Sequence, residues 1–327
     1  MSISGDTLRY DGQVAIITGA GGGLGRSYAK LLASRGAKVV VNDIASRMDG
    51  GDGGDSAPEA VVDEIIAAGG VAIADRHRVD DEPGGIVTTA LDAWGRIDVV
   101  VASAGIATGG TLEEAPRSAW QRNVDVALHG TVGLIKCAWP ALAKTSGRVV
   151  TVASSSIFGQ VHTAPYASSK AAVLVATRIA AEEGRTVGIR ANCVLPMAHT
   201  RMTEAIPAEE FKSALRRDFP PDRAAAVVGW LAHESVSVSG EAFTIGGGRA
   251  ARVFLGVTAG WGAGDSAPED FRDHAAEILD LTDYVVPTNS MAEVAWAGRC
   301  LGIDLEGKWA PSLPSAVAVD GPSSPSD

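Results

Sequence analysis

Cysteine is scarce in this sequence, and its scarcity excludes two classes of protein. The 327 residues contain three cysteines, Cys137, Cys193 and Cys300, which lie far apart. An odd number of cysteines argues against a disulfide framework, and the Cys-x-x-Cys spacing typical of structural metal sites does not occur. We therefore expect reduced thiols, no metal site and a cytoplasmic location.

The chain also lacks long apolar runs and an excess of positive charge. No run approaches the roughly 18 apolar residues that suggest a membrane span, and the first residues form no apolar signal region. The net charge is −11, whereas proteins that bind nucleic acids carry clustered Lys and Arg. We expect neither a membrane span nor a nucleic-acid partner, although a local basic pocket for a phosphorylated ligand remains compatible with this charge.

Short apolar runs alternate with helical stretches over most of the chain. Runs rich in Val and Ile predict buried strands at residues 13–18, 37–43, 71–75, 97–103, 148–153, 189–195 and 242–245. Helices are expected at residues 24–35, 56–69, 84–94, 118–144 (bent or broken near 124–130) and 164–183. Apolar strands that alternate with helices indicate a parallel sheet covered on both faces. We predict an α/β fold with a doubly wound parallel sheet of the Rossmann type, in three α/β/α layers.

The domain organisation follows from the same pattern. Residues 1–250 form the predicted Rossmann-type domain. Residues 251–310 contain two further helix starts of the capping-box type, at Ser266 and Ser290, and predict a helical extension packed on the core. Residues 311–327 are rich in Pro and Ser, which predicts a disordered tail.

A glycine-rich segment at residues 18–25 joins the first strand to the first helix. Glycines at this point let the backbone turn sharply and approach a pyrophosphate, which a helix N-terminus favours. Asp43 ends the second strand, 18 residues after Gly25. A carboxylate there accepts hydrogen bonds from an adenosine ribose and repels a 2′-phosphate, so the pattern favours NAD over NADP. The alternative for Asp43 is a solvated residue at a strand end.

Tyr166 and Lys170 are four residues apart in the helix predicted at 164–183. That spacing places both side chains on one face of the helix. A nearby positive charge stabilises the phenolate and lowers the pKa of a tyrosine from about 10. The pair therefore predicts that Tyr166 acts as a general acid and base near neutral pH.

Together these motifs resemble the short-chain dehydrogenase/reductase family over residues from about 10 to 250. The family's Thr-Gly-x-x-x-Gly-x-Gly pattern falls on Thr18, Gly19, Gly23 and Gly25, and its Tyr-x-x-x-Lys pattern on Tyr166 and Lys170. Within that family, residues 40–43, 90–101, 201–204 and 230–235 resemble the (3R)-hydroxyacyl-CoA dehydrogenase part of peroxisomal multifunctional enzyme type 2 and its bacterial relatives. The resemblance implies an NAD-dependent oxidoreductase that interconverts a secondary alcohol and a ketone, with a 3-hydroxyacyl-CoA or steroid substrate.

The resemblance also implies which residues form the site. The catalytic residues would be Ser154, Tyr166 and Lys170. The dinucleotide would contact Gly19, Gly23, Leu24, Gly25, Asp43, Val79, Ala102, Ala104, Gly105, Tyr166, Lys170, Pro196 and Thr200.

The sequence departs from the family pattern at the catalytic serine. The family usually places this serine 13 residues before its tyrosine, where this chain has Ala153. Counting forward from the strand at 148–153 leads instead to Ser154, with Ser155 and Ser156 next in line. We choose Ser154, because a position at a strand end is better defined than a position in a loop.

Other departures concern the proton relay and the cofactor site. Ala127 occupies the position of the asparagine that joins the family's proton relay. Asn123, one turn earlier, either substitutes for it in part or is an ordinary surface or capping residue. Met197 replaces the glycine that follows Pro196, and the acidic residue expected after the third strand aligns with Arg78, with Asp80 close by. The remaining departure is Ala102, where the family has asparagine.

Three hypotheses about partners and function remain open. Met202, Ile206 and Phe211 form either an apolar lid over a small-molecule substrate or ordinary packing. The helix at 164–183 is apolar nearly all round, which favours a homodimer or homotetramer. The departures at Ala127, Met197 and Ala102 leave a second function open, a catalytically weakened dinucleotide-binding protein that serves as a sensor or assembly partner.

Overall fold

The computed structural model describes residues 7–45, 57–204 and 208–303. The chain forms two compact units, which divide between Val253 and Phe254. The expected tail at 311–327 and the expected helix cap at Ser56 lie outside the described residues. The packing of the extension on the core stays a prediction.

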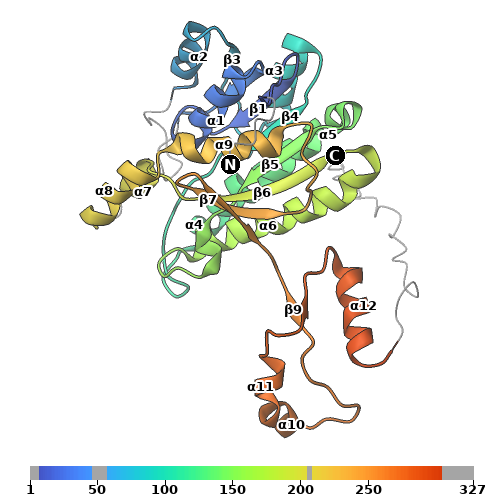
Figure 1. Cartoon of the computed structure of the whole chain (residues 1–327). Coiled ribbons are helices and arrows are strands. Elements are labelled where there is room, and N and C mark those ends of the chain that lie inside the picture. Colours follow the sequence, from blue (N-terminus) through green and yellow to red (C-terminus); the bar gives the residue numbers. More distant parts are fainter. Residues whose placement is uncertain (1–6, 46–56, 205–207, 304–327) are drawn as a thin grey trace, which may run out of the picture. The chain divides into compact units, whose positions relative to one another are not determined.

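The first unit is built around an eight-stranded sheet in the order β3-β2-β1-β4-β5-β6-β7-β8 (Figure 1). Every neighbouring pair is parallel except β7 and β8. The direction of winding reverses between β1 and β4, the point at which ligands bind in doubly wound sheets. The predicted fold class is confirmed. The strands are β1 (Val14–Thr18), β2 (Lys38–Asn42), β3 (Val71–Asp75), β4 (Val99–Ala102), β5 (Arg148–Val152), β6 (Arg190–Pro196), β7 (Ala242–Gly246) and β8 (Arg249–Val253).

Six helices cover the two faces of this sheet. One face carries α1 (Gly23–Ser34), α2 (Pro58–Ala67) and α9 (Pro221–Ala232). The other carries α3 (Pro83–Trp94), α5 (Gly130–Thr145) and α6 (Ala164–Gly184). The central strands β1, β4 and β5 are wholly buried between these layers, which explains why they are rich in Val and Ile.

The predicted break in the long helix is a π-helix. Helix α4 (Arg117–Asn123) continues through the π-helical turn Val124–His129 into α5. By length and composition this stretch, Arg117–Thr145, is the one helix among the described residues that could cross a membrane. Since 44% of its most apolar window is buried and α5 packs on α3, α6 and the sheet, it has the surroundings of a core helix.

Shorter elements complete the two units. The first unit adds α7 (Arg201–Glu204) and α8 (Glu209–Asp218), and 3₁₀ turns at Ser155–Phe158 and Arg185–Val187. The second unit contains β9 (Val257–Thr258), β10 (Tyr284–Val285), α10 (Pro268–Asp273), α11 (Ala275–Ile278) and α12 (Ser290–Cys300).

The expected serine caps of the second unit are wrong by one residue. Ala267 is the N-cap of α10, where the Asp270 carboxylate accepts from the Ala267 backbone N–H at 2.8 Å. Asn289 caps α12, because its side chain accepts from the Ala292 N–H at 3.0 Å. Both helices are present, although their caps differ from those predicted.

Candidate active site

The glycine turn between β1 and α1 fits a dinucleotide pyrophosphate. Gly19 has φ +66°, and a Cβ on it would lie 2.9 Å from the Ala104 Cα. A Cβ on Gly25 would lie 2.2 Å from the Gly19 carbonyl oxygen, so a side chain there would collide with backbone. The N-cap of α1 is Gly22, which offers no capping side chain, and the first turn of the helix has no acidic residue. The positive end of the helix dipole is therefore available to an anion.

The Asp43 carboxylate is fixed beside this turn. One carboxylate oxygen accepts from the Gly21 backbone N–H at 3.0 Å, and the other accepts from the Ala45 N–H at 2.8 Å. A Cβ on Gly21 would approach the Asp43 carboxyl group to 3.0 Å, so only glycine leaves this contact undisturbed. The negative charge thus lies next to the loop that faces the pyrophosphate.

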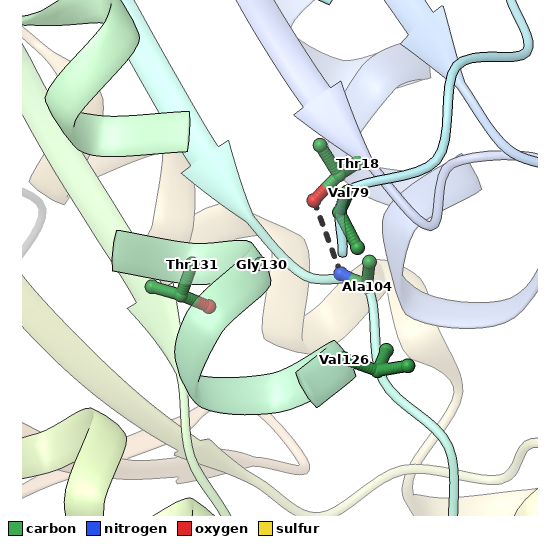
Figure 2. Close-up of a pocket in the computed structure, with 6 residues that line it drawn as sticks. All are labelled: Thr18, Val79, Ala104, Val126, Gly130 and Thr131. Carbon is green, nitrogen blue, oxygen red and sulfur yellow. Dashed lines mark hydrogen bonds between the residues drawn. The ribbon is translucent and has the colours of Figure 1, made fainter. Parts of the chain in front are cut away.

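A small depression at the end of β1 is lined by two of the predicted cofactor contacts, Val79 after β3 and Ala104 after β4. It is lined by Thr18, Val79, Ala104, Val126, Gly130 and Thr131 (Figure 2). The Thr18 hydroxyl accepts from the backbone N–H groups of Ser103 and Ala104, each at 3.1 Å. These bonds hold the loop after β4 against the end of β1. The structure therefore brings Val79 and Ala104 together beside the glycine turn.

Ser154 and Tyr166 meet at the carboxyl end of β5. The Ser154 hydroxyl accepts from the Ser156 N–H at 3.2 Å, and it lies near enough to the Tyr166 phenol to lower the pKa of that group. Ser155 is exposed, and the buried Ser156 hydroxyl has no hydrogen-bond partner. Of the three candidate serines, Ser154 is thus the one that the structure joins to Tyr166.

Burial raises the pKa of Tyr166 above its ordinary value, and the hydrogen bond from Ser154 opposes that rise. This direction differs from the decrease expected from the sequence. The reason is that the Lys170 ammonium lies 6.0 Å from the centroid of the Tyr166 ring and donates its hydrogen bond elsewhere. Loss of hydration consequently outweighs the attraction between the ammonium and a phenolate.

Lys170 lies almost wholly inside the protein, with 4% of its surface exposed. Its Nζ donates to the Val152 carbonyl at 2.8 Å, and a Cβ on Gly105 would lie 3.1 Å from that nitrogen. Burial lowers the pKa of Lys170 to about 8, and the neighbouring Cys193 acts in the opposite direction. The ammonium is therefore held between the loop after β4 and the end of β5.

The remaining cofactor contacts lie after β6 and at the end of β4. Pro196 ends β6, Met197 follows with 42% of its surface exposed, and Ala102 ends β4. Thr200 lies beside the glycine turn, since a Cβ on Gly23 would be 3.7 Å from the Thr200 methyl carbon. Leu24 packs against the core on the α1 face of the sheet. Asp80 is paired with Arg78 at 3.0 Å and is largely buried, with 10% of its side chain exposed.

The environment of Asn123, in α4, differs from the one predicted. Asn123 is 0% exposed, so the interpretation as a surface or capping residue is wrong. Its amide donates to the Ala119 carbonyl at 2.8 Å and to Thr108 in the loop after β4. Ala127, in the π-helix, is buried and adds no polar side chain. A single asparagine in a helical pattern carries no sequence signal that would reveal such a contact.

The comparisons with known proteins agree with this geometry. The family model for short chain dehydrogenases matches residues 13–210. Mouse peroxisomal multifunctional enzyme type 2 is 37% identical over 286 residues, which cover 86% of this chain and 38% of that protein. The chain thus spans less than two thirds of the length of the multifunctional relatives that it matches.

Two further relatives are matched by this chain over nearly the whole of their own length. The (2S)-[(R)-hydroxy(phenyl)methyl]succinyl-CoA dehydrogenase subunit of Thauera aromatica is 34% identical over 251 residues, covering 72% of this chain and 96% of that protein. A 7α-hydroxysteroid dehydrogenase solved with NADH and 7-oxo glycochenodeoxycholic acid has 30% identity and a TM-score of 0.65, covering 73% of this chain and 95% of that one. The resemblance predicted from the motifs is confirmed, and this chain belongs to the short-chain dehydrogenase/reductase family of oxidoreductases that act on CH–OH groups.

Proposed function

We propose that this protein is an NAD-dependent dehydrogenase that interconverts a secondary alcohol and a ketone on a 3-hydroxyacyl-CoA or steroid-type substrate. The observation that carries the proposal is the group formed by Ser154, Tyr166 and Lys170 at the end of β5. It lies at the carboxyl edge of the sheet, as does the glycine turn, where ligands of doubly wound sheets bind.

The mechanism assigns one task to each side chain. A bound nicotinamide dinucleotide supplies the carbon that accepts or gives the hydride. Tyr166 gives a proton to the ketone oxygen or takes one from the alcohol, and its raised pKa keeps it protonated at neutral pH. Ser154 hydrogen-bonds the same oxygen as that atom gains negative charge. Lys170, held by the Val152 carbonyl, provides a positive charge on the inner side of the site.

Asp43 supports NAD as the cofactor. Its carboxylate is held by the N–H groups of Gly21 and Ala45, so it cannot turn away from the glycine turn without loss of both bonds. In that place it accepts hydrogen bonds from ribose hydroxyls and repels a 2′-phosphate.

An apolar rim supports a bulky, water-poor substrate. We define the rim as Leu112, Phe158, Val161 and Met197, which follow β4, β5 and β6 at the carboxyl edge of the sheet. Leu112 and Val161 are each 82% exposed, and Phe158 is 66% exposed. Covering these side chains with an acyl chain or a steroid removes apolar surface from water, which favours binding. Of the expected lid, Phe211 on α8 is exposed, the side chain of Met202 is not described, and Ile206 lies outside the described residues.

The test is a turnover assay with named probes. Purified protein is mixed with NAD or NADP and either (3R)-hydroxydecanoyl-CoA or glycochenodeoxycholic acid, and NADH or NADPH formation is followed by absorbance. We expect turnover with NAD and at least one probe, and a kcat lower by about 100-fold or more in Tyr166→Phe. Binding of NADH without turnover of any probe would favour the sensor hypothesis instead.

We also infer that the protein forms a homodimer or larger homo-oligomer through α6. Val175 and Ile179 are half-exposed and lie four residues apart on the outer side of that helix. A second copy is the occupant that covers an apolar stripe of this kind symmetrically. Sedimentation velocity should show a dimer or tetramer that Ile179→Glu dissociates, whereas a monomeric unmodified protein contradicts the inference.

A further inference from the structure

The side chain of Asn123 is bonded on one side only. Its Nδ2 donates to the Ala119 carbonyl at 2.8 Å, to the Thr108 carbonyl at 3.4 Å, and to the Thr108 hydroxyl. Its Oδ1 is buried and has no hydrogen-bond partner among the described residues. A wholly buried amide thus has a carbonyl oxygen that no described protein group satisfies.

Stability alone does not explain an asparagine at this place. A buried polar atom without a partner costs about 1–3 kcal/mol, whereas an apolar side chain of similar size has no such cost. Leucine at position 123 would avoid this penalty, because the side chain at this position is wholly buried. Leucine could make neither the bond to the Ala119 carbonyl, which lies within the same helix, nor the bonds to Thr108, which join the helix to the loop after β4.

Thr108 leads directly to the start of the catalytic helix. Two residues later, the Gly110 N–H donates to the His162 carbonyl at 2.9 Å, and the Ala164 N–H donates to the Gly110 carbonyl at 3.1 Å. These bonds form a parallel bridge between Gly110 and Thr163. Ala164 is the first residue of α6, two before Tyr166. The loop after β4 and the beginning of α6 are therefore one connected structure.

The backbone at this connection is in a costly conformation. His162 has φ +61°, which is uncommon for a residue with a side chain. A Cβ on Gly109 would lie 2.8 Å from the His162 carbonyl oxygen, so the two segments approach as closely as glycine allows. Such a conformation persists when the surrounding structure holds it in place. The Asn123–Thr108 contact is one of the bonds that hold it.

We propose that Asn123 is a positioning residue for the reaction. Through Thr108 it holds the loop of residues 105–110 against the start of α6, and so keeps Tyr166 and the substrate-side wall in their working geometry. Asn123 itself touches neither substrate nor cofactor. The proposal rests on the family's alcohol–ketone chemistry and does not depend on which substrate the enzyme uses.

The experiment compares Asn123→Leu with a matched control, Asn192→Leu. Asn192 is also 0% exposed, but both ends of its amide are bonded, to the Val238 carbonyl at 2.9 Å and the Glu241 N–H at 3.2 Å. For Asn123→Leu we expect an unchanged or higher Tm, a kcat for (3R)-hydroxydecanoyl-CoA lowered about 10- to 100-fold, and a KM for NAD changed less than about twofold. For Asn192→Leu we expect the reverse, a lower Tm with kcat per folded enzyme retained.

Hydrogen exchange gives a readout that needs no substrate. The amides of Gly110 and Ala164 should exchange faster in Asn123→Leu and in Thr108→Val, and remain protected in Asn192→Leu. In the double variant Asn123→Leu/Thr108→Val, the increase in exchange and the decrease in kcat should be no larger than in either single variant, since both substitutions remove the same contact. Retained protection and kcat in Asn123→Leu would overturn the proposal, and so would a fall in Tm that matches the fall in kcat. If no probe is turned over, the exchange data still test the role of Asn123, and only the proposed substrate class is contradicted.

Discussion

The Lys170 ammonium donates a hydrogen bond to the Val152 carbonyl at 2.8 Å, while the Tyr166 ring centroid lies 6.0 Å away. Val152 ends β5, and Ser154 follows two residues later. The same strand end therefore holds the lysine and presents the serine that bonds to Tyr166. Helix α6 supplies the other two members of the group, so the packing of α6 on the sheet determines the geometry of the site.

Removing the Tyr166 hydroxyl should lower kcat strongly without loss of cofactor binding. We expect Tyr166→Phe to lower kcat by about 10²- to 10⁴-fold, the range that general acid–base catalysis contributes. NADH affinity, measured by fluorescence titration, should change little. Tyr28→Phe is the matched control, because the buried Tyr28 hydroxyl has no hydrogen-bond partner in the described part of the chain. Equal activity losses in the two variants would contradict the role of Tyr166.

Alcohol oxidation should speed up as the pH rises. Burial raises the pKa of Tyr166, so the phenolate that accepts the alcohol proton is a minor species at neutral pH. Between pH 7 and 9, kcat/KM for oxidation should increase with pH, whereas ketone reduction, which uses the protonated phenol, should not. Initial rates in both directions over this range provide the check. An oxidation rate that is flat with pH would show that Tyr166 is not the base.

Buried Lys170 should make stability depend on pH. Its pKa falls from 10.5 in the unfolded chain to about 8 in the fold, so between these values the unfolded chain binds more protons. The free energy of unfolding should therefore rise by about 2 kcal/mol from pH 7.5 to 9.5. Urea titrations should show this slope in the unmodified protein and not in Lys170→Met. Cys193 is present in both proteins, so equal slopes would assign the effect to another group.

Neutralising Asp43 should weaken the preference for NAD. Asp43→Asn keeps an oxygen for the Gly21 N–H but removes the negative charge. We expect the ratio of kcat/KM for NADP to that for NAD to increase about tenfold, equivalent to roughly 1.4 kcal/mol. Asp11→Asn, at an exposed ion pair with Arg9, should leave the ratio unchanged. A ratio that responds equally to both changes would reflect net charge alone.

The glycine turn should not accept a methyl group. In Gly25→Ala the new Cβ would lie 2.2 Å from the Gly19 carbonyl oxygen, so we expect weaker NADH binding and a Tm lowered by several degrees. Gly84→Ala, in α3, is the control, since its Cβ would meet no atom nearer than the Cys137 sulfur at 3.9 Å. Alanine also favours a helix over glycine by about 1 kcal/mol, so the control should be as stable or more stable. Unchanged NADH binding and Tm in Gly25→Ala would mean that the turn shifts to accommodate the methyl group.

The elements that were predicted well are those with a strong local pattern. Strands β1 to β7 are apolar runs, and all were expected within a few residues of their observed bounds. Strand β8 was not expected, because Arg249 to Val253 contains two arginines and two alanines, forms no apolar run and is mostly exposed. It pairs antiparallel with β7 only because a turn of three glycines with positive φ, Gly246 to Gly248, reverses the chain. Pairing at an edge depends on a neighbour, which a local pattern does not reveal.

By itself the sequence determined the fold class, the glycine turn after the first strand and the four-residue spacing of Tyr166 and Lys170 on one helix, since apolar periodicity and residue spacing express these directly. The tertiary structure alone decided three further points. It joined Ser154, among three consecutive serines, to Tyr166; it reversed the expected direction of the Tyr166 pKa shift; and it placed Asn123 in the interior against Thr108. Each of these depends on burial and on contacts between distant segments, and desolvation and long-range hydrogen bonds exist only once the chain has folded.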